Sequence, residues 1–389
     1  MISTMPVTRE ELVQRAAALV PRLRERAERT EQLRRLPDET VADLVDAGLM
    51  RIVTPDSFGG AGLDFDAKLE VALELGRGCG STAWCYSILT SHSWWLGHFP
   101  RQGQEEYFAD SPDTLGSSSL DPSRARVEVV PGGYRVSGRW SFSSGCDAAS
   151  WVTVGGLGPS GLLWFLVPMA EVTIIDTWFV SGLRGTGSKD LVIDDAFVPA
   201  HRVAEVRLMK EGRTDGWALH GRPSYRAPLY ALMPGTLVAP VLGMARGMVE
   251  AFADQLRGRT RPDGTELTHS VASQLRLAES SAEMDAARSV LRQNTREVLD
   301  LAARGETPTL LDRARYRRDH AFLVKLGIRA IGRLFEASGG HALLESNPLQ
   351  RFHRDALAAS QHFGTRWDEN AELYGRVALG LEVAPTARL

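Results

Sequence analysis

Two hydroxyl side chains and a glycine, Ser143, Ser144 and Gly145, follow a stretch in which aromatic and polar residues alternate. This alternation is typical of a half-buried strand, so we expect residues 134–142 to form one, with Phe142 on its inward face. A flat ligand at the end of such a strand would find serine and backbone donors for its edge and aromatic rings for its face. The same residue types also suit an ordinary β-turn, because serine and glycine favour turns for local reasons.

A second group of residues capable of chemistry lies between Ser81 and Gly97, which we expect to form a helix. This segment is unusually rich in aromatic and imidazole side chains, with His98 just beyond it: Trp84, Tyr86, His92, Trp94 and Trp95. Such a helix can pack into a core, and it can equally form one wall of a pocket for an aromatic ligand. Both interpretations stay open at this point.

Two histidines toward the C-terminal end, His353 and His362, are nine residues apart. We expect both to lie on one helix, whose apolar stripe is formed by Phe352, Ala356, Ala359 and Phe363. At about 100° per residue, their imidazoles then point to opposite edges, so at most one of them enters a given pocket. His362 lies beside small residues, where its ring can reach a neighbouring surface. A histidine in an interface is the alternative.

The composition indicates a soluble globular protein of two or three domains. The chain has 389 residues, 43% of them hydrophobic, and a net charge of -3, which leaves no basic excess for nucleic acid. We expect no signal peptide at Met1–Pro6 and no membrane span, because the strongest apolar run, Leu162–Met169, is far shorter than the roughly 20 residues required. We therefore expect a cytoplasmic protein. Three cysteines predict neither a disulfide nor a metal site.

The periodicity of the chain divides it into three parts and predicts an α+β fold. Residues 1–114 have helical spacing, although Pro21 should kink or divide the first helix. Residues 115–214 change to period two in short segments, which predicts a compact antiparallel β-barrel or sandwich. Residues 215–389 return to long amphipathic helices, which predict a four-helix bundle that also serves as an oligomer interface.

This order of helices, barrel and bundle resembles the acyl-CoA dehydrogenase fold over nearly the whole chain, with matches at 36–49, 55–62, 134–145, 182–199 and 339–356. In many members of that family an Arg-Asp-Ala sequence leads to Tyr-Glu-Gly-Thr, whose carboxylate removes a proton from the substrate. Here Arg354-Asp355-Ala356 leads to His362-Phe363-Gly364-Thr365, so Phe363 stands where the base would be. A phenyl ring cannot accept a proton, which disfavours dehydrogenation. Some members carry the base on another helix, so dehydrogenation stays an alternative.

The same segments look more like the oxygenase component of two-component flavin-dependent aromatic monooxygenases, such as 4-hydroxyphenylacetate 3-hydroxylase, which share the fold. In that family a Ser-Gly after a barrel strand meets the flavin near N5, and a late histidine faces the flavin C4a atom. A second histidine, on the aromatic helix, lines the substrate site. Ser144-Gly145, His362 and His92 match these three places.

The resemblance implies a monooxygenase that hydroxylates a phenolic or polycyclic aromatic substrate through a flavin C4a-hydroperoxide. The cofactor would be reduced FMN or FAD, supplied by a separate NAD(P)H:flavin reductase, and molecular oxygen would be the co-substrate. Ser144 would hydrogen-bond the flavin edge, His362 would deprotonate or orient the phenol, and His92 would fix the other end of the substrate. An acyl-CoA dehydrogenase or oxidase, and an N- or S-oxygenase of the same fold, remain alternatives.

The resemblance also implies a homotetramer, arranged as a dimer of dimers, and adds further residues to the site. Arg259, in the loop Arg257–Gly264, is placed like the family arginine that reaches the flavin phosphate. The flavin contacts that we expect are Phe142, Ser143, Ser144, Gly145, Thr186, Arg259, Gly339 and Gly340. The substrate contacts that we expect are His92, Trp94, Trp95, Ser118 and Phe363.

Overall fold

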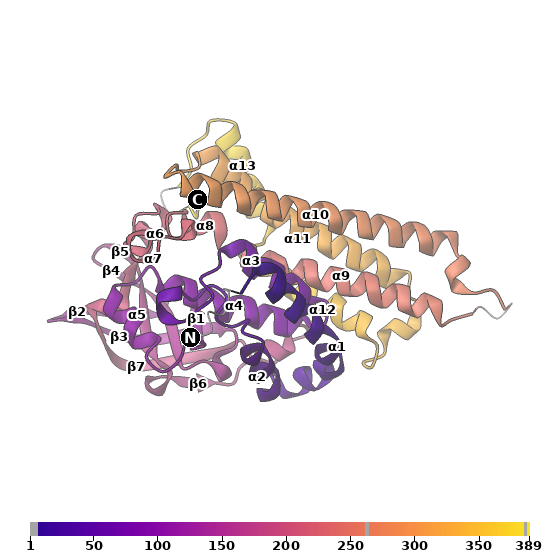
Figure 1. Cartoon of the computed structure of the whole chain (residues 1–389), viewed down its shortest axis with the longest axis horizontal. Helices are drawn as coiled ribbons and strands as arrows, with labels where there is room; N and C mark the ends of the chain where they lie inside the picture. The colour runs from indigo at the N-terminus through magenta and orange to yellow at the C-terminus, as the bar shows by residue number, and fades with distance from the viewer. Residues whose placement is uncertain (1–6, 261–263, 385–386) are drawn as a thin grey trace, which may run out of the picture.

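A computed structural model describes residues 7–260, 264–384 and 387–389 of the protein (Figure 1). Met1–Pro6, where we expect no signal peptide, and residues 261–263 of the loop Arg257–Gly264 lie outside the described residues. The chain begins with helices, continues through strands and ends with long helices. This order is the one that the periodicity of the sequence predicts.

Five helices form the first part of the chain: α1 (Arg9–Leu33), α2 (Asp38–Asp46), α3 (Phe65–Gly76), α4 (Gly80–Leu96) and α5 (Arg101–Tyr107). Thr8 caps α1 by accepting a hydrogen bond from the backbone N–H of Glu11. Pro21 lies inside α1 and does not divide it, so of the two expected effects division does not occur. Helix stability comes mostly from packing, and α1 buries apolar residues on both sides of Pro21.

Helix α4 lies in the interior, and Ile88 is its only residue that is not buried. It packs between α3 and α9 (Gly235–Arg257) and also contacts strand β1 (Gly116–Ser119). Because it is enclosed on all sides, its sequence has no continuous polar stripe. A helix held in this way is a rigid support for the side chains that it directs toward the strands.

The strands form two four-stranded sheets. The first has the order β1-β4-β5-β8 and the second the order β2-β3-β7-β6. Strand β1 pairs parallel with β4, and all the other pairs are antiparallel. The remaining strands are β2 (Ala125–Val130), β3 (Gly133–Ser143), β4 (Trp151–Gly158), β5 (Gly161–Pro168), β6 (Thr173–Ile175), β7 (Lys189–Pro199) and β8 (Val203–Glu205).

The two sheets do not close into the antiparallel barrel that we expected. Where β1 approaches β3, serine side chains make the contact in place of a backbone ladder. Ser119 Oγ donates to the carbonyl oxygen of Ser141 at 2.6 Å, and Ser143 Oγ donates to Ser117 Oγ at 3.0 Å. Side-chain bonds of this kind hold the sheets together without continuing either one. The space between the sheets is filled by a separate apolar cluster that includes Trp140 and Phe165.

Long helices form the last part of the chain, and α9, α10 and α11 run side by side away from the sheets (Figure 1). The segment Leu229–Arg257 is long and apolar enough to cross a membrane, and it was missed in the sequence because Pro and Gly interrupt it. However, 83% of its most apolar window is buried inside the protein, as in a core helix. The other elements are α6 (Val206–Lys210), α7 (Gly216–His220), α8 (Leu229–Leu232), α10 (Val271–Ala303), α11 (Leu310–Glu336), α12 (Pro348–Ser360) and α13 (Trp367–Ala378).

The helices at the two ends of the chain share one hydrophobic core. Buried residues of α1, α3 and α4 belong to the same apolar cluster as those of α9, α10, α11 and α12. Trp164 of β5 also belongs to it, so one sheet rests on this core. Helix α4 is therefore enclosed by helices from both ends of the chain and by the first sheet.

Candidate active site

The end of β3 turns two serines toward the interior. Phe142 has a backbone φ of 68° and lies in a β-bulge, where the register between β3 and β7 shifts. The bulge reverses the alternation, so that Ser143 is buried and Phe142 is 72% exposed. The Phe142 ring meets the Trp178 ring in a T-shaped arrangement. Our expectation that Phe142 faces inward is therefore wrong, because a regular strand was assumed up to its last residue.

Ser144 is the centre of a chain of buried hydroxyl groups. Its Oγ lies 2.7 Å from Ser188 Oγ, which in turn lies 2.7 Å from Thr186 Oγ1. Trp84 of α4 donates its indole N–H to Ser144 Oγ at 3.2 Å. Gly145, with φ of 73°, donates its N–H to the carbonyl oxygen of Thr186 at 2.9 Å and packs against Leu89, which a side chain at this position would meet.

The loop that carries Thr186 and Ser188 is fixed by a carboxyl group of α12. Asp355 is buried and accepts a hydrogen bond from the backbone N–H of Leu183 at 2.6 Å. Burial is the main cause that raises the pKa of Asp355 to about 7. Leu183 itself has a left-handed backbone with φ of 52°, which requires such external support. Asp355 thus connects α12 to the hydroxyl chain.

His362 lies in the turn that follows α12, because that helix ends at Ser360. Our expectation of one helix through both histidines is therefore wrong. His353 is still on the helix and stacks on Phe335 of α11, with ring centres 4.3 Å apart. The His362 ring lies 5.9 Å from the Trp84 ring, so one indole touches both the imidazole and Ser144.

A hydrogen bond to the His362 ring shows which of its two nitrogen atoms carries the proton. The backbone N–H of Gly364 donates to Nδ1 at 3.0 Å, so the neutral ring carries its proton on Nε2. Burial is the first cause that lowers the pKa of His362 to about 4. The other causes are the positive charges of Arg388, Arg317 and Arg366. At neutral pH the imidazole is therefore uncharged, and its Nε2–H is a hydrogen-bond donor.

His92 lies about two turns, or about 12 Å, further along α4 than Trp84. Its ring is protonated on the other nitrogen than that of His362. Its Nδ1 donates to the carbonyl oxygen of Ile88 at 2.8 Å, so the neutral ring keeps a free lone pair on Nε2. That atom is buried and has no partner in the part of the chain that the structure describes. Burial lowers the pKa of His92 to about 3, so the ring stays neutral.

Aromatic side chains surround the free nitrogen of His92. The Trp95 ring lies 4.6 Å from His92 and 4.6 Å from Trp164 of β5. A side chain at Gly116 of β1 would meet His92, and Ser118 is on the same face of that strand. Trp94 is on another side of α4, where it packs against Phe65 and His98. The structure therefore groups Trp95 and Ser118 with His92 and separates Trp94 from them.

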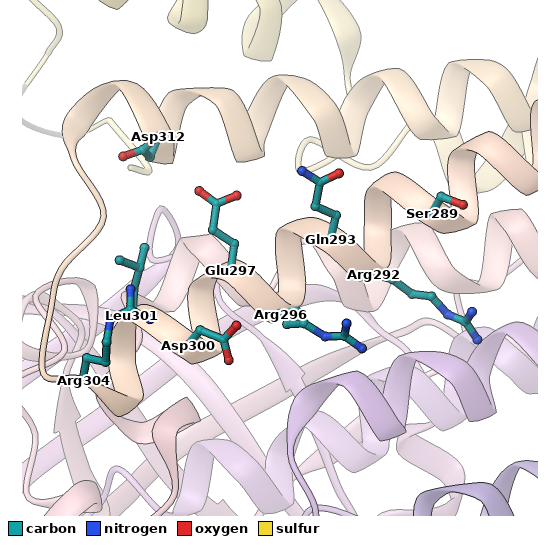
Figure 2. Close-up of a pocket in the computed structure, with 9 residues that line it drawn as sticks. All are labelled: Ser289, Arg292, Gln293, Arg296, Glu297, Asp300, Leu301, Arg304 and Asp312. Atoms are coloured by element: carbon teal, nitrogen blue, oxygen red, sulfur yellow. The ribbon is translucent and has the colours of Figure 1, made fainter.

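Three of the expected flavin contacts lie elsewhere in the chain. Arg259 follows α9, and Gly339 and Gly340 follow α11, in connections at the end of the bundle away from the sheets (Figure 1). Both glycines are exposed, and Arg259 is partly exposed. Within one chain, these residues do not join the group around Ser144. A pocket of about 760 Å³ is also outside this group: Figure 2 shows its mostly charged and polar lining on α10 and at Asp312.

Ser188 and Asp355 are functional candidates that the sequence patterns did not single out, and Trp84 was expected only as part of a possible pocket wall. A signal for Trp84 was present, because Trp84, Ile88, His92 and Trp95 have the i, i+4, i+8, i+11 spacing of one helix face. Ser188 follows a glycine-rich loop, and Asp355 precedes the expected site. Neither residue is marked as a site residue by its local sequence. Only the fold brings them to Ser144.

The groups around Ser144 fit the edge of a flavin. Ser144 has a free lone pair, and Trp84 supplies an aromatic wall. His92 adds an orphaned buried acceptor to the same side of α4. The residues present therefore suit a flat heteroaromatic cofactor together with a second aromatic molecule.

Comparisons with known proteins agree with this geometry. Residues 8–109 match the family model of the acyl-CoA dehydrogenase N-terminal domain, and residues 236–367 match that of the C-terminal domain. The chain is 40% identical to the flavin-dependent monooxygenase oxygenase subunit HsaA of Mycobacterium tuberculosis (strain CDC 1551 / Oshkosh), over 95% of each chain. It is 30% identical to the p-hydroxyphenylacetate 3-hydroxylase oxygenase component of Acinetobacter baumannii, over 98% of this chain and 92% of the relative.

A solved structure is similar to the chain over almost its full length. XiaF from Streptomyces sp., in complex with FADH2 and glycerol, superposes with a TM-score of 0.90 at 30% identity, covering 97% of this chain and 98% of that chain. The resemblance that we inferred from the sequence is thereby confirmed. The chain belongs to the family of oxygenase components of two-component flavin-dependent monooxygenases, which have the acyl-CoA dehydrogenase fold.

Proposed function

We propose that the protein hydroxylates a phenolic aromatic substrate with molecular oxygen, using reduced FMN or FAD that a separate NAD(P)H:flavin reductase supplies. The observation that carries this proposal is the continuous contact from His362 through Trp84 to Ser144. It joins a proton donor in the turn after α12 to the hydroxyl group at the end of β3. When bound, the reduced flavin reacts with oxygen and supplies an electrophilic oxygen atom.

Ser144 and its neighbours hold the edge of the cofactor in this proposal. Ser143 and Thr186 are buried close to it, and the left-handed backbone of Gly145 forms the turn that carries Ser144. Trp84 excludes water from this contact, because its buried indole covers the hydroxyl group of Ser144. A dry site matters, because water and stray protons divert reduced oxygen to hydrogen peroxide.

His362 orients the substrate through its Nε2–H and does not act as a strong base. With a pKa of about 4, its imidazolium form would return a proton to a phenolate at once. Instead of a base, nearby positive charges would favour the phenolate, because they lower the pKa of a bound phenol. Arg317 is buried with its Nε unpaired among the described residues, and Arg388 lies 3.9 Å from the Phe363 ring. Positive charge at this position favours phenolate, which is the electron-rich form of the ring.

His92 fixes the other end of the substrate. Its Nε2 accepts a hydrogen bond from a hydroxyl group, and Trp95 and Trp164 form an apolar wall beside it. Both indole N–H groups lack partners in the described chain and offer donors to the same group. A substrate with one hydroxyl near His362 and a second polar group near His92 satisfies all of these atoms.

We also propose that each chain consists of three domains, residues 1–114, 115–214 and 215–389. Four such chains would form a cytoplasmic homotetramer. Arg259, Gly339 and Gly340 are at the far end of the bundle, so their contact with flavin requires a second copy of the chain. Sedimentation of the purified protein tests the assembly. Weaker flavin binding by oligomeric Arg259→Ala than by the oligomeric wild type would support a site shared between two copies. A monomeric wild-type protein that binds flavin with full affinity would contradict the shared site.

Reconstitution with a flavin reductase tests the activity. The protein alone should not oxidise NAD(P)H, and with the reductase it should consume oxygen and hydroxylate members of a panel of phenols, naphthols and indoles. His362→Ala should keep flavin affinity and lower product per oxygen consumed about ten-fold, the effect of one lost hydrogen bond to the substrate. His353→Ala is the matched control, because that imidazole stacks on Phe335 away from Trp84. Unchanged coupling in His362→Ala would remove His362 from the reaction.

A further inference from the structure

We infer that a relay of hydroxyl groups fixes Ser144 as a hydrogen-bond acceptor toward the flavin, and that this direction selects the reduced cofactor. The inference rests on the proposed function, because it takes Ser144 to lie at the flavin edge. It assigns positioning roles to Ser188 and Thr186, which touch Ser144 directly or through one hydroxyl.

The direction of the relay begins at a carbonyl group. Thr186 Oγ1 lies 2.9 Å from the carbonyl oxygen of Leu183, and a carbonyl oxygen can only accept. The same oxygen accepts from Trp178 Nε1 at 3.0 Å and from the Thr186 backbone N–H at 3.1 Å. If Thr186 did not donate there, two oxygen atoms would face each other at 2.9 Å without a proton between them. The proton of Thr186 therefore points to Leu183.

The remaining protons follow from this first one. Since the Thr186 proton points to Leu183, the contact of 2.7 Å between Thr186 and Ser188 requires Ser188 to donate. The contact of 2.7 Å between Ser188 and Ser144 then requires Ser144 to donate. Ser144 also accepts from Trp84 Nε1 at 3.2 Å. A hydroxyl group has one proton and two lone pairs, so Ser144 keeps one lone pair and no proton for a ligand.

A free lone pair distinguishes the two redox states of a flavin. N5 of the oxidised ring is an acceptor, whereas N5 of the reduced ring carries a hydrogen atom and is a donor. Ser144 can accept from reduced N5–H, but it meets the oxidised N5 with two lone pairs face to face. The relay therefore favours binding of reduced flavin and release of oxidised flavin. This preference suits a protein that receives its cofactor already reduced.

Binding measurements test the inference without turnover. The dissociation constants of reduced and oxidised FMN are measured anaerobically, and their ratio gives the redox preference. Ser188→Ala removes the acceptor of the Ser144 proton, which can then rotate toward oxidised N5. We expect the preference for reduced FMN to fall on the order of ten-fold, the effect of about one hydrogen bond. For a two-electron couple this equals a decrease of about 30 mV in the midpoint potential of the bound flavin.

Three further variants define the cause. Thr186→Val should also lower the preference, and Thr186→Ser should restore it, because serine can repeat the hydrogen bonds of threonine. Ser119→Ala is a matched control, since it removes a buried serine that donates to the Ser141 carbonyl and does not touch the relay. If Ser188→Ala fails to fold, Thr186→Val carries the test.

The outcomes separate the inference from the proposed function. An unchanged preference in Ser188→Ala, with both redox states bound, would overturn the relay and leave the oxygenase function standing. A stronger preference in that variant would mean that the hydroxyl groups point in the opposite direction, which also overturns it. A wild-type protein that binds neither redox state of FMN nor of FAD would contradict the proposed function itself.

Discussion

The two ends of α4 treat their polar atoms differently. Near Trp84, the hydroxyl groups of Ser144, Ser188 and Thr186 are linked in one chain, although Ser81 and Tyr86 of α4 itself have unpaired hydroxyl groups in the described structure. Near His92, the described structure leaves unpaired His92 Nε2 and the indole N–H groups of Trp95 and Trp164. An unpaired buried polar atom is costly, on the order of 1 to 3 kcal/mol. The hydroxyl chain at Ser144 (the paired end) is thus already oriented, whereas His92 Nε2 and the two indole N–H groups (the unpaired end) gain partners only when a molecule binds.

This difference indicates which end holds which molecule. A cofactor that is exchanged with a reductase needs a contact of fixed direction, and the paired end supplies one. A substrate that enters from solution gains affinity where buried groups lack partners, and the unpaired end offers both an acceptor and donors. In the proposed arrangement the same rigid helix carries the two ends, so its geometry would set the distance between cofactor and substrate.

The largest effect that can break this comparison comes from the unpaired end. His92→Ala should raise the KM for the phenolic substrate about ten-fold or more and leave the affinity for reduced flavin unchanged. Steady-state kinetics with the reductase and a separate flavin titration measure the two quantities. His98→Ala is the control, because His98 is equally buried but packs against Trp94 and Tyr225. Loss of flavin binding in His92→Ala would show that the two ends are not independent.

A smaller effect is expected at the paired end. Trp84→Phe keeps an aromatic ring beside His362 but removes the N–H that Ser144 accepts. We expect hydrogen peroxide release per turnover to rise about five-fold, as for the loss of one modest hydrogen bond, with little change in KM. Peroxide and product are quantified in the same reaction. A rise in KM without a change in peroxide would reverse the assignment of the two ends.

The smallest effect on rate is expected from pH. Burial is the main cause that lowers the pKa of five histidines to values between about 3 and about 4: His92, His98, His220, His320 and His362. His92 and His362 are therefore neutral throughout the physiological range. We expect less than about a two-fold change in turnover between roughly pH 6.5 and pH 8. A limb of the pH–rate profile near the ordinary histidine pKa would contradict this assignment.

Stability should follow pH even where the rate does not. The unfolded chain takes up protons on these histidines near pH 6.5, whereas the folded protein takes them up near pH 3 to 4. The unfolded state therefore binds more protons in this interval. The contribution of these histidines to the free energy of unfolding is at its maximum above about pH 6.5 and decreases as the pH falls. Asp355, with a pKa raised to about 7, and Asp64 and Asp113, whose pKa burial also raises, have the opposite sign but are three groups against five. Thermal unfolding at pH 5 and pH 7 checks the direction.

The sequence by itself determined the order of helices, strands and helices, and it placed Ser144, His362 and His92 among the site candidates. The order of elements and the family are confirmed, because hydrophobic periodicity is local and because the resemblance extends over most of the chain, whereas the roles of the three site candidates stay predictions. It also indicated the absence of a glutamate at the position of Phe363, which directed attention to oxygen chemistry.

Only the tertiary structure decided which of these residues meet. The bulge at Phe142 turned Ser143 and Ser144 inward, and the end of α12 at Ser360 freed His362 to reach Trp84. The two sheets stayed open because serine side chains join β1 to β3 where a barrel needs a backbone ladder. Each of these features depends on contacts between residues far apart in the chain, which no local pattern records.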